Sequence, residues 1–272
     1  ANMGTELGAT TTVFPSDQAV KVFMRSQGRE KDWSEILSDE DARYDINEEI
    51  DLAQLEPLIA KPCSPGNVVP VREVQGMPIY QSYIGSSANP GYRDLAVAAK
   101  IVEGKQISAN VSFDLNPSSR QVLENLVRDG HLISLIRAGG RIHQAGCNGC
   151  IGMGQSPATG QISLRTVPRN FPGRSGTPED QVYLVSPETA AASALTGVIT
   201  DPRELLMDYP RIKDPEFPSL NRGVLESPLA FKEAVNIKLR KVANIVSFPQ
   251  FDQMPNSLKI PVLLKVNHDL ST

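Results

Sequence analysis

The stretch IYQSYIGSSANPGYRDLAVAAKIVEG, residues 79–104, contains one complete strand–turn–helix unit. Residues 79–84 predict a strand, which runs into a turn of small residues at 85–89. Pro90 suits the first turn of a helix, because the N–H that proline lacks would have no intrahelical partner there. Apolar residues at helical spacing follow as far as Gly104, a typical helix stop. The stretch therefore predicts the repeating unit of an α/β sheet.

Further units of this kind follow along the chain. We expect a strand over 107–115, a helix opened by Asn116 and Pro117 that stops near Gly130, a short helix over 132–136, and strands over 141–145 and 181–185, the last followed by a helix from Ser186. Strands that alternate with helices predict a three-layer α/β/α fold with a mostly parallel sheet. Ligands bind at the carboxyl ends of such strands, so the turns at Ser87, Cys147 and Ser186 would share one edge.

The flanking segments are less regular. Residues 16–28 predict a helix with Ser16 or Asp17 as its cap, and residues 44–52 alternate loosely enough to form a strand. Four prolines between positions 57 and 70 are typical of a boundary or crossover segment.

Prolines recur from about residue 201, and we expect one more helix within 227–246, with its basic side chains on a solvated face. The predicted domain organisation is the C-terminal part of a preceding α/β domain at 1–60, a crossover at 61–76, the main α/β domain at 77–205 and a linker at 206–272.

Composition excludes several classes of protein. The net charge is −4 and no basic block is present, so nucleic acid is not an expected partner. No apolar run is as long as a membrane span, and no secretory signal pattern occurs. Three cysteines, an odd number, argue against a disulfide scaffold and favour a reducing compartment such as the cytoplasm.

The stretch GCNGCIGMGQ, residues 146–155, places Cys147 and Cys150 in a glycine-rich turn. Two thiols at this spacing can face one metal ion or cluster, and the glycines let backbone amides approach it. Two other interpretations stay open: a pair of buried small apolar side chains, and a thioredoxin-like redox pair. The glycine flanks favour the metal or cluster.

The motif RNFPGR, residues 169–174, supplies two candidate substrate-binding side chains. Guanidinium groups bind carboxylates through two parallel hydrogen bonds, so Arg169 and Arg174 suit a di- or tricarboxylate. Ordinary surface ion pairing is the alternative for each arginine alone.

Three more side chains are weaker candidates. Asn2 and Glu6 lie in a segment of small residues, where a glutamate can be buried near a ligand. His143 comes four residues before Cys147, and we interpret it mainly as strand packing.

Together these motifs resemble the aconitase family of hydro-lyases. Five segments occur in the family's order: ANMGTELGATTTVFP at 1–15, IGSSAN at 84–89, GCNGCIG at 146–152, RNFPGR at 169–174 and SPETAAASAL at 186–195. The resemblance covers most of residues 1–200. It implies the family's iron–sulfur domain type, with residues 77–205 as the cluster-binding domain.

The resemblance implies a [4Fe–4S] cluster held by three thiolates, with an open iron that acts as a Lewis acid on the substrate hydroxyl. Cys147 and Cys150 match two of the ligand positions. The third corresponds to Ser87, a poor iron ligand because a hydroxyl ionises far less readily than a thiol, whose pKa is about 8.5. Cys63 is the spare thiol.

By the same resemblance, Arg169 and Arg174 would bind substrate carboxylates. Asn2 would lie beside the cluster and substrate, and Glu6 would hydrogen-bond the iron-bound water or hydroxyl. Pro168 stands where the family commonly has asparagine, which removes one polar contact.

The implied activity is the isomerisation of citrate and isocitrate through cis-aconitate. One alternative is an isopropylmalate or homoaconitate hydro-lyase, and another is a cluster-free RNA-binding or regulatory relative. The family's remaining domains supply further catalytic residues, and both ends of this chain resemble cut ends. We therefore expect a central fragment, inactive by itself, whose partners are a small tricarboxylate and the remaining domains of the same enzyme.

Overall fold

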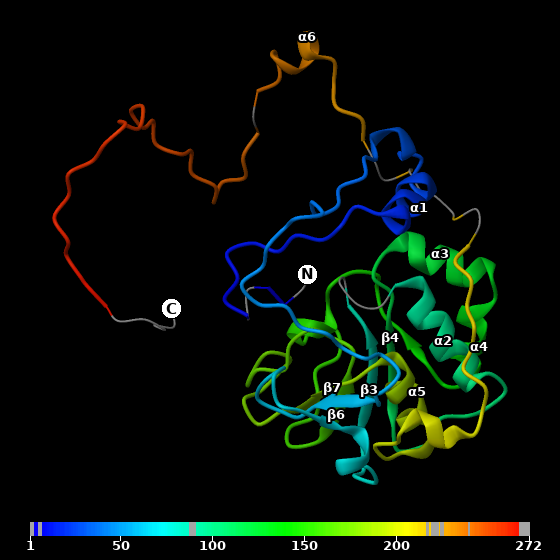
Figure 1. Cartoon of the computed structure of the whole chain (residues 1–272). Helices are drawn as coiled ribbons and strands as arrows, with labels where there is room; N and C mark the ends of the chain where they lie inside the picture. Colours follow the sequence, from blue (N-terminus) through cyan, green and yellow to red (C-terminus); the bar gives the residue numbers. More distant parts are fainter. Residues whose placement is uncertain are drawn as a thin grey trace. The chain divides into compact units, whose positions relative to one another are not determined.

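The computed structural model describes residues 3–4, 7–86, 91–215, 218, 223, 226–238 and 240–266. The chain divides into two units, Ala1–Val224 and Leu225–Thr272 (Figure 1). In the second unit the described residues form one short helix, α6 (Phe231–Ala234), and their side chains are exposed. The predicted domain boundaries at 60, 76 and 205 remain predictions.

The first unit is built on a seven-stranded sheet in the order β2-β1-β7-β6-β3-β4-β5. The strands are β1 (Leu58–Ala60), β2 (Val68–Pro70), β3 (Gln81–Gly85), β4 (Ser112–Asn116), β5 (Arg141–Ile142), β6 (Ile162–Arg165) and β7 (Gln181–Leu184). Strands β3 to β7 pair in parallel, whereas β1 is antiparallel to both β2 and β7. The predicted α/β fold with a mostly parallel sheet is confirmed.

Helices follow the strands as the alternation predicted. They are α1 (Gln18–Ser26), α2 (Tyr92–Val102), α3 (Arg120–Arg128), α4 (His131–Arg137) and α5 (Pro187–Thr196), with short 3₁₀ turns η1 (Glu30–Asp32), η2 (Val71–Glu73), η3 (Gly149–Ile151) and η4 (Pro202–Leu205). Within the described residues, no helix is long and apolar enough to cross a membrane.

Helices α2 and α5 pack against each other over a face of small side chains. Ala98 and Ala99 of α2 and Ala191 and Ala194 of α5 are fully buried, which allows close approach of the two backbones. Ser186 caps α5 as its sequence predicts, accepting a hydrogen bond from Thr189 N.

The two faces of β3 have different neighbours because successive side chains alternate. The Ser82 hydroxyl donates to the Ala190 carbonyl of α5 at 2.8 Å, so this face meets the helices. Tyr83 points the other way and meets the connection that carries the cysteines. One face is therefore an apolar core and the other supports the candidate site.

Several predicted elements differ from the structure. Strand β4 begins only at Ser112, and α3 begins at Arg120 because the hydroxyl of Ser119 caps it. Residues 44–52 form no strand: they are exposed and have no neighbouring strand to pair with. The expected helix within 227–246 is reduced to α6.

Three strands were not expected. β1 and β2 lie in the proline-rich segment, where proline is tolerated at a sheet edge. β6 carries the buried polar residues Ser163 and Arg165, which interrupt the apolar pattern that marks a buried strand.

A close approach joins the ends of β3 and β4. Gly85 has φ +141°, and a Cβ added there would lie 2.0 Å from the carbonyl oxygen of Asn116. Its backbone N–H donates to the Thr166 hydroxyl at 3.0 Å, just beyond β6. Gly85 thus brings three strand ends together at one edge.

Asp201 stabilises the segment that follows α5. Its buried carboxylate accepts from the Arg203 backbone N–H at 2.9 Å and from the Arg203 guanidinium at 2.6 Å. The side-chain hydrogen bond from Arg203 lowers the pKa of Asp201 below its ordinary value, although burial opposes this. Because the pKa of Asp201 is lower in the folded chain than in the unfolded chain, the ionised carboxylate adds to the free energy of unfolding at pH values above the unfolded pKa. This contribution is lost as the pH falls through the folded pKa.

Asp201→Asn should therefore lower the free energy of unfolding by about 1 kcal/mol at pH 7, with the difference shrinking below about pH 4. Urea unfolding at pH 7 and pH 3 measures this. Asp208→Asn, an exposed carboxylate on the same segment, is the control and should change little. An equal deficit of Asp201→Asn at both pH values would contradict the explanation.

Candidate functional site

The candidate residues follow strands that end at one edge of the sheet. Because β3 to β7 are parallel, the cysteine turn after β5 and the turn at Ser186 after β7 leave from the same edge, as predicted. The RNFPGR segment, which follows β6, leaves from this edge too. Three predicted site residues, Ser87, Asn2 and Glu6, lie outside the described residues.

Two glycines set the shape of the cysteine turn. At Gly149, the first residue of η3, a Cβ would lie 2.1 Å from the Tyr83 ring. Gly152 has φ +76°, and a Cβ there would lie 2.2 Å from the carbonyl oxygen of Ser175. The turn therefore packs directly on β3 and on the loop of the RNFPGR motif.

The two thiols of the turn face each other. Cys150 is buried and Cys147 is exposed, and their side chains are within hydrogen-bonding reach. The pKa of Cys150 is raised to about 11, chiefly by burial and also by hydrogen bonding and charge from Cys147, while Arg174 opposes the rise. The apolar-pair interpretation therefore fits only half of the turn, since Cys147 is open to solvent.

Arg174 is the cation nearest to this pair in the motif. Its guanidinium is within hydrogen-bonding reach of Cys150, and its Nε is buried without a partner among the described residues. A buried donor without an acceptor costs free energy. An anion at this position, whether a cluster or a substrate carboxylate, would satisfy it.

The remaining residues of the motif have different surroundings. Arg169 is half-buried. Asn170 is buried, and its amide donates to the carbonyls of Lys61 at 2.8 Å and Val182 at 3.1 Å. Asn170 therefore ties the loop to β7 and to the segment after β1, a role that the sequence did not reveal.

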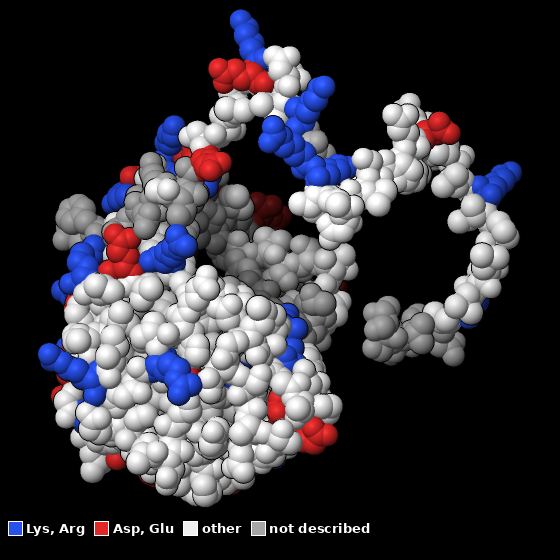
Figure 2. Space-filling view, turned by 180° about the vertical axis from the view of Figure 1, so that it is seen from behind, with Lys and Arg blue, Asp and Glu red and all other residues white. Residues whose placement is uncertain are grey.

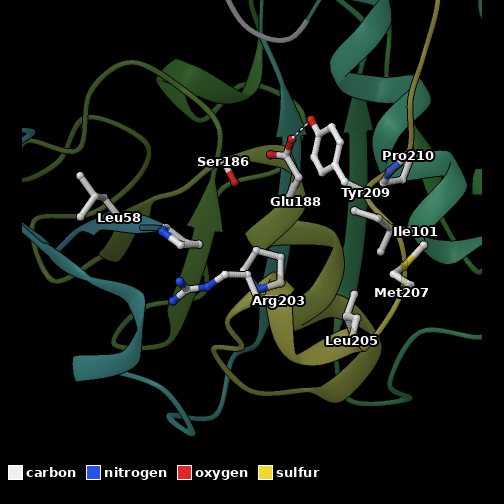
Figure 3. A pocket seen from close by; sticks show the side chains of 11 residues that line it. Leu58, Ile101, Ser186, Glu188, Arg203, Leu205, Met207, Tyr209 and Pro210 are labelled. Carbon is white, nitrogen blue, oxygen red and sulfur yellow. Dashed lines mark hydrogen bonds between the residues drawn. The ribbon is translucent and has the colours of Figure 1, made fainter. Parts of the chain in front are cut away.

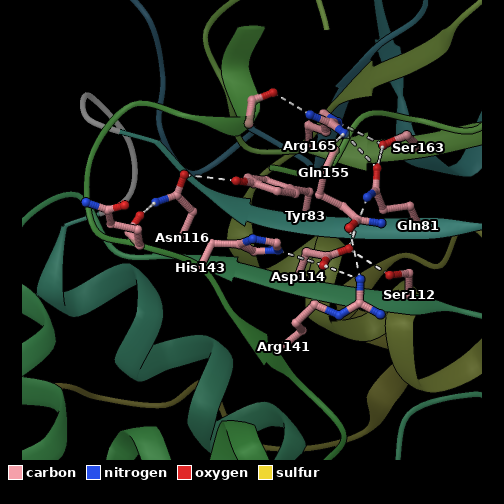
Figure 4. Close-up of polar contacts among 12 residues, drawn as sticks. Gln81, Tyr83, Ser112, Asp114, Asn116, Arg141, His143, Gln155, Ser163 and Arg165 are labelled. Carbon is pink, nitrogen blue, oxygen red and sulfur yellow. Dashed lines mark hydrogen bonds and ion pairs between the residues drawn. The ribbon is translucent and has the colours of Figure 1, made fainter. Parts of the chain in front are cut away.

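A buried polar network lies under the turn (Figure 4). Arg165 is fully buried and donates to the carbonyl of Gln155 at 2.7 Å, to Gln81 Oε1 at 2.8 Å and to the Ser163 hydroxyl at 3.0 Å. It also donates to the carbonyl of Gly149. The sequence did not predict this network; its one local signal was an arginine inside a run of otherwise mostly apolar residues.

His143 belongs to the same network. Its Nε2 lies 2.8 Å from Asp114 Oδ1, and its ring stacks on Tyr83 with centroids 5.6 Å apart. The Tyr83 hydroxyl in turn donates to Asn116 Oδ1 at 2.9 Å. The contacts of His143 with Tyr83 and Asp114 agree with its interpretation as a packing residue.

Among the described residues, no three His, Cys, Asp or Glu side chains gather as a metal site would require. Cys63, exposed in the β1–β2 turn, has φ +82°. The thiol pair and the orphaned Arg174 donor fit an anionic cluster, with the third ligand position at Ser87 remaining a prediction.

A separate cavity of about 330 Å³ lies beside α5 (Figure 3). Its lining is mostly apolar, with Ile101, Leu205 and Met207, and Tyr209 donates to Glu188 Oε1 at 2.9 Å. None of the predicted ligand or substrate residues lines it.

Comparison with known proteins agrees with this geometry. The family model described as "Aconitase family (aconitate hydratase)" matches residues 1–78 and 72–197. The chain belongs to the aconitase family. Its resemblance, read from five short motifs, is thereby confirmed.

Curated aconitase-family relatives are similar over three quarters of the chain. A protein of Archaeoglobus fulgidus named 3-isopropylmalate dehydratase large subunit 2 is 40% identical over 207 residues, 76% of this chain and 50% of that protein. A 3-isopropylmalate dehydratase large subunit 1 of Methanopyrus kandleri is 44% identical over 75% of this chain and 49% of that protein. The homoaconitase large subunit of Thermus thermophilus is 39% identical over 75% and 48%. The chain spans about half the length of these relatives.

The packing of Gly149 on Tyr83 gives a test of this aconitase-family turn. Gly149→Ala should lower the free energy of unfolding by about 1–3 kcal/mol, because the new methyl overlaps a buried ring that has no space to move. Chemical denaturation measures the effect. Gly66→Ala, where a Cβ would be 3.6 Å from the nearest side chain, is the matched control and should be nearly neutral. Equal stability of the two variants would show that the turn does not pack as described.

Proposed function

We propose that this chain is the cluster-carrying part of the large subunit of an aconitase-family dehydratase that acts on 3-isopropylmalate. One observation supports the site most directly: two paired thiols in a strand-end glycine turn lie beside a buried Arg174 Nε without a partner among the described residues. The names of the relatives support the substrate class.

The proposed roles follow the resemblance. Cys147 and Cys150 would hold the [4Fe–4S] cluster, with Ser87 as the third ligand. When bound, such a cluster supplies a Lewis-acidic iron for the elimination of a hydroxyl group. Arg174 would orient a substrate carboxylate through its free donor, and Arg169 would bind a second one.

Two proposed catalytic residues, Asn2 and Glu6, complete the set. Glu6 would hydrogen-bond the departing water or hydroxyl, and Asn2 would lie beside the substrate. Their roles rest on motif position alone. The remaining part of the enzyme, a small subunit or further domains, would supply the other catalytic groups.

The expected citrate–isocitrate reaction receives less support than the alternative. The relatives are named as dehydratases of 3-isopropylmalate and as homoaconitases, so a role in the tricarboxylic acid cycle is not supported. Homoaconitate is the second candidate substrate, because the Thermus thermophilus relative is nearly as similar.

An RNA-binding role has weaker support. The charge balance is acidic, and Figure 2 shows basic side chains scattered over this face of the first unit rather than gathered in one patch. Affinity for RNA that falls steeply between low and moderate salt would favour the RNA-binding alternative.

Anaerobic reconstitution with iron and sulfide tests the cluster. We expect the iron and acid-labile sulfide of one cluster per chain, loss of both in Cys147→Ala, and slower loss of iron to a chelator in Ser87→Cys because a thiolate binds iron better than a hydroxyl. Cys63→Ala is the control and should behave as the unchanged chain. Full iron retention in Cys147→Ala would reject the assignment.

Substrate choice can be tested by ligand binding to the reconstituted chain. The test does not need turnover, and we expect no turnover from this chain alone. 3-Isopropylmalate should change the EPR spectrum of the reduced cluster at lower concentration than citrate, and Arg174→Met should weaken that response, since it removes the free carboxylate donor. A stronger response to citrate would favour the aconitate hydratase reaction. Turnover of cis-aconitate by the chain alone would contradict its proposed dependence on other parts of the enzyme.

A further inference from the structure

The cysteine turn is held from below by one buried side chain. Arg165, the last residue of β6, reaches out of the sheet with its fork of donors. One terminal nitrogen donates to the carbonyl of Gly149, and the other donates to the carbonyl of Gln155 at 2.7 Å. These carbonyls lie on either side of Cys150, so a single guanidinium spans the segment that contains this thiol (Figure 4).

The guanidinium is itself fixed in place. Its Nε donates to the Ser163 hydroxyl at 3.0 Å, and Gln81 Oε1 accepts from it at 2.8 Å and from Ser163 at 2.7 Å. It stacks over the Tyr83 ring, with Cζ 4.7 Å from the centroid. Since β3 and β6 supply these contacts, the position of the fork is set by the pairing of two central strands.

The charge of Arg165 has no carboxylate acceptor among the described residues. Its acceptors there are two backbone carbonyls, an amide oxygen and a hydroxyl, although the side chain is fully buried. Asp114 is reached only through Gln81, whose Nε2 donates to Asp114 Oδ2 at 3.0 Å. A buried cation with neutral partners is costly unless a negative group lies close by.

We propose that Arg165 is a positioning residue for the cluster site: it clamps residues 149–155 onto the sheet and holds Cys150 in place as a ligand. The cluster part rests on the proposed function. The clamp alone concerns the turn and can be tested without iron.

Arg165 keeps its charge in this buried position. Burial lowers the pKa of Arg165 to about 10, and the charges of Tyr83, Asp114, Asp180 and Cys150 oppose this fall. The group therefore stays protonated at neutral pH. Under the proposed function, in which Ser87 takes the place of a third thiolate, a fixed cation beside Cys150 would support a weaker set of ligands.

The first measurement is thiol modification of the reduced, iron-free chain at one fixed pH, with each cysteine quantified by mass spectrometry. In the unchanged chain, exposed Cys63 and Cys147 should react quickly and buried Cys150 slowly. Arg165→Met should raise the rate at Cys150 by about tenfold or more, because two hydrogen bonds from a charged donor are lost. Arg165→Lys, which keeps the charge but cannot span both carbonyls, should give an intermediate rate.

Leu95→Ala is the matched control. It opens a cavity in the core under α2, far along the chain from the turn, and destabilises the fold without touching the clamp. The ratio of the Cys150 rate to the Cys147 rate should stay unchanged in this variant. A similar selective rise in Leu95→Ala, or no rise in Arg165→Met, would overturn the clamp. A normal Cys150 rate in Arg165→Lys would overturn the two-carbonyl fork as its cause.

Iron retention separates this inference from the proposed function. After reconstitution, Arg165→Met should lose iron to a chelator about tenfold faster than the unchanged chain. A chain that takes up no iron while Arg165→Met still exposes Cys150 would reject the proposed cluster and keep the clamp. Normal uptake with unchanged retention in Arg165→Met would reject the clamp's role at the cluster and keep the proposed function.

Discussion

The buried guanidinium of Arg165 is the interaction on which the site depends. A fully buried charge must have its donors satisfied, and its acceptors come from three separate parts of the chain: β3, β6 and the cysteine turn. The cation can only be accommodated when the strands are paired and the turn lies against them. Sheet formation and placement of Cys150 are therefore linked through one side chain.

Two glycines of the cysteine turn make the same link, because a residue without a side chain allows a close backbone contact. Gly149 lets the turn lie on the Tyr83 ring, and Gly152 lets it lie on the carbonyl of Ser175. The cysteine turn and the arginine loop consequently form one packed assembly, although they follow different strands. This packing explains how Arg174 comes within reach of Cys150 while its Nε stays buried.

The chain belongs to the aconitase family. By the resemblance, Ser87 would stand at the position of a thiolate ligand and Pro168 at that of a common asparagine. The buried guanidinium of Arg165 lies under the cysteine turn and donates to its carbonyls at Gly149 and Gln155. The chain spans about half the length of relatives that are named as large subunits.

By itself, the sequence determined the family, the α/β class and the elements with strong local signals. Ser186 before Pro187 marked the start of α5, and small apolar residues at helical spacing marked α2, because caps and periodicity act within a few residues. It also indicated the cysteine turn and the arginine loop, since each lies within one short motif.

Only the tertiary structure decided what supports these motifs. Strand β6 escaped prediction because its buried side chains are polar, and they are stable there only through partners on β3 and in the turn. Residues 44–52 had the pattern of a strand but no neighbour to pair with, so they formed none. The same reason applies to Arg165: its role arises from carbonyls at Gly149 and Gln155, which the sheet brings to it and which local sequence cannot specify.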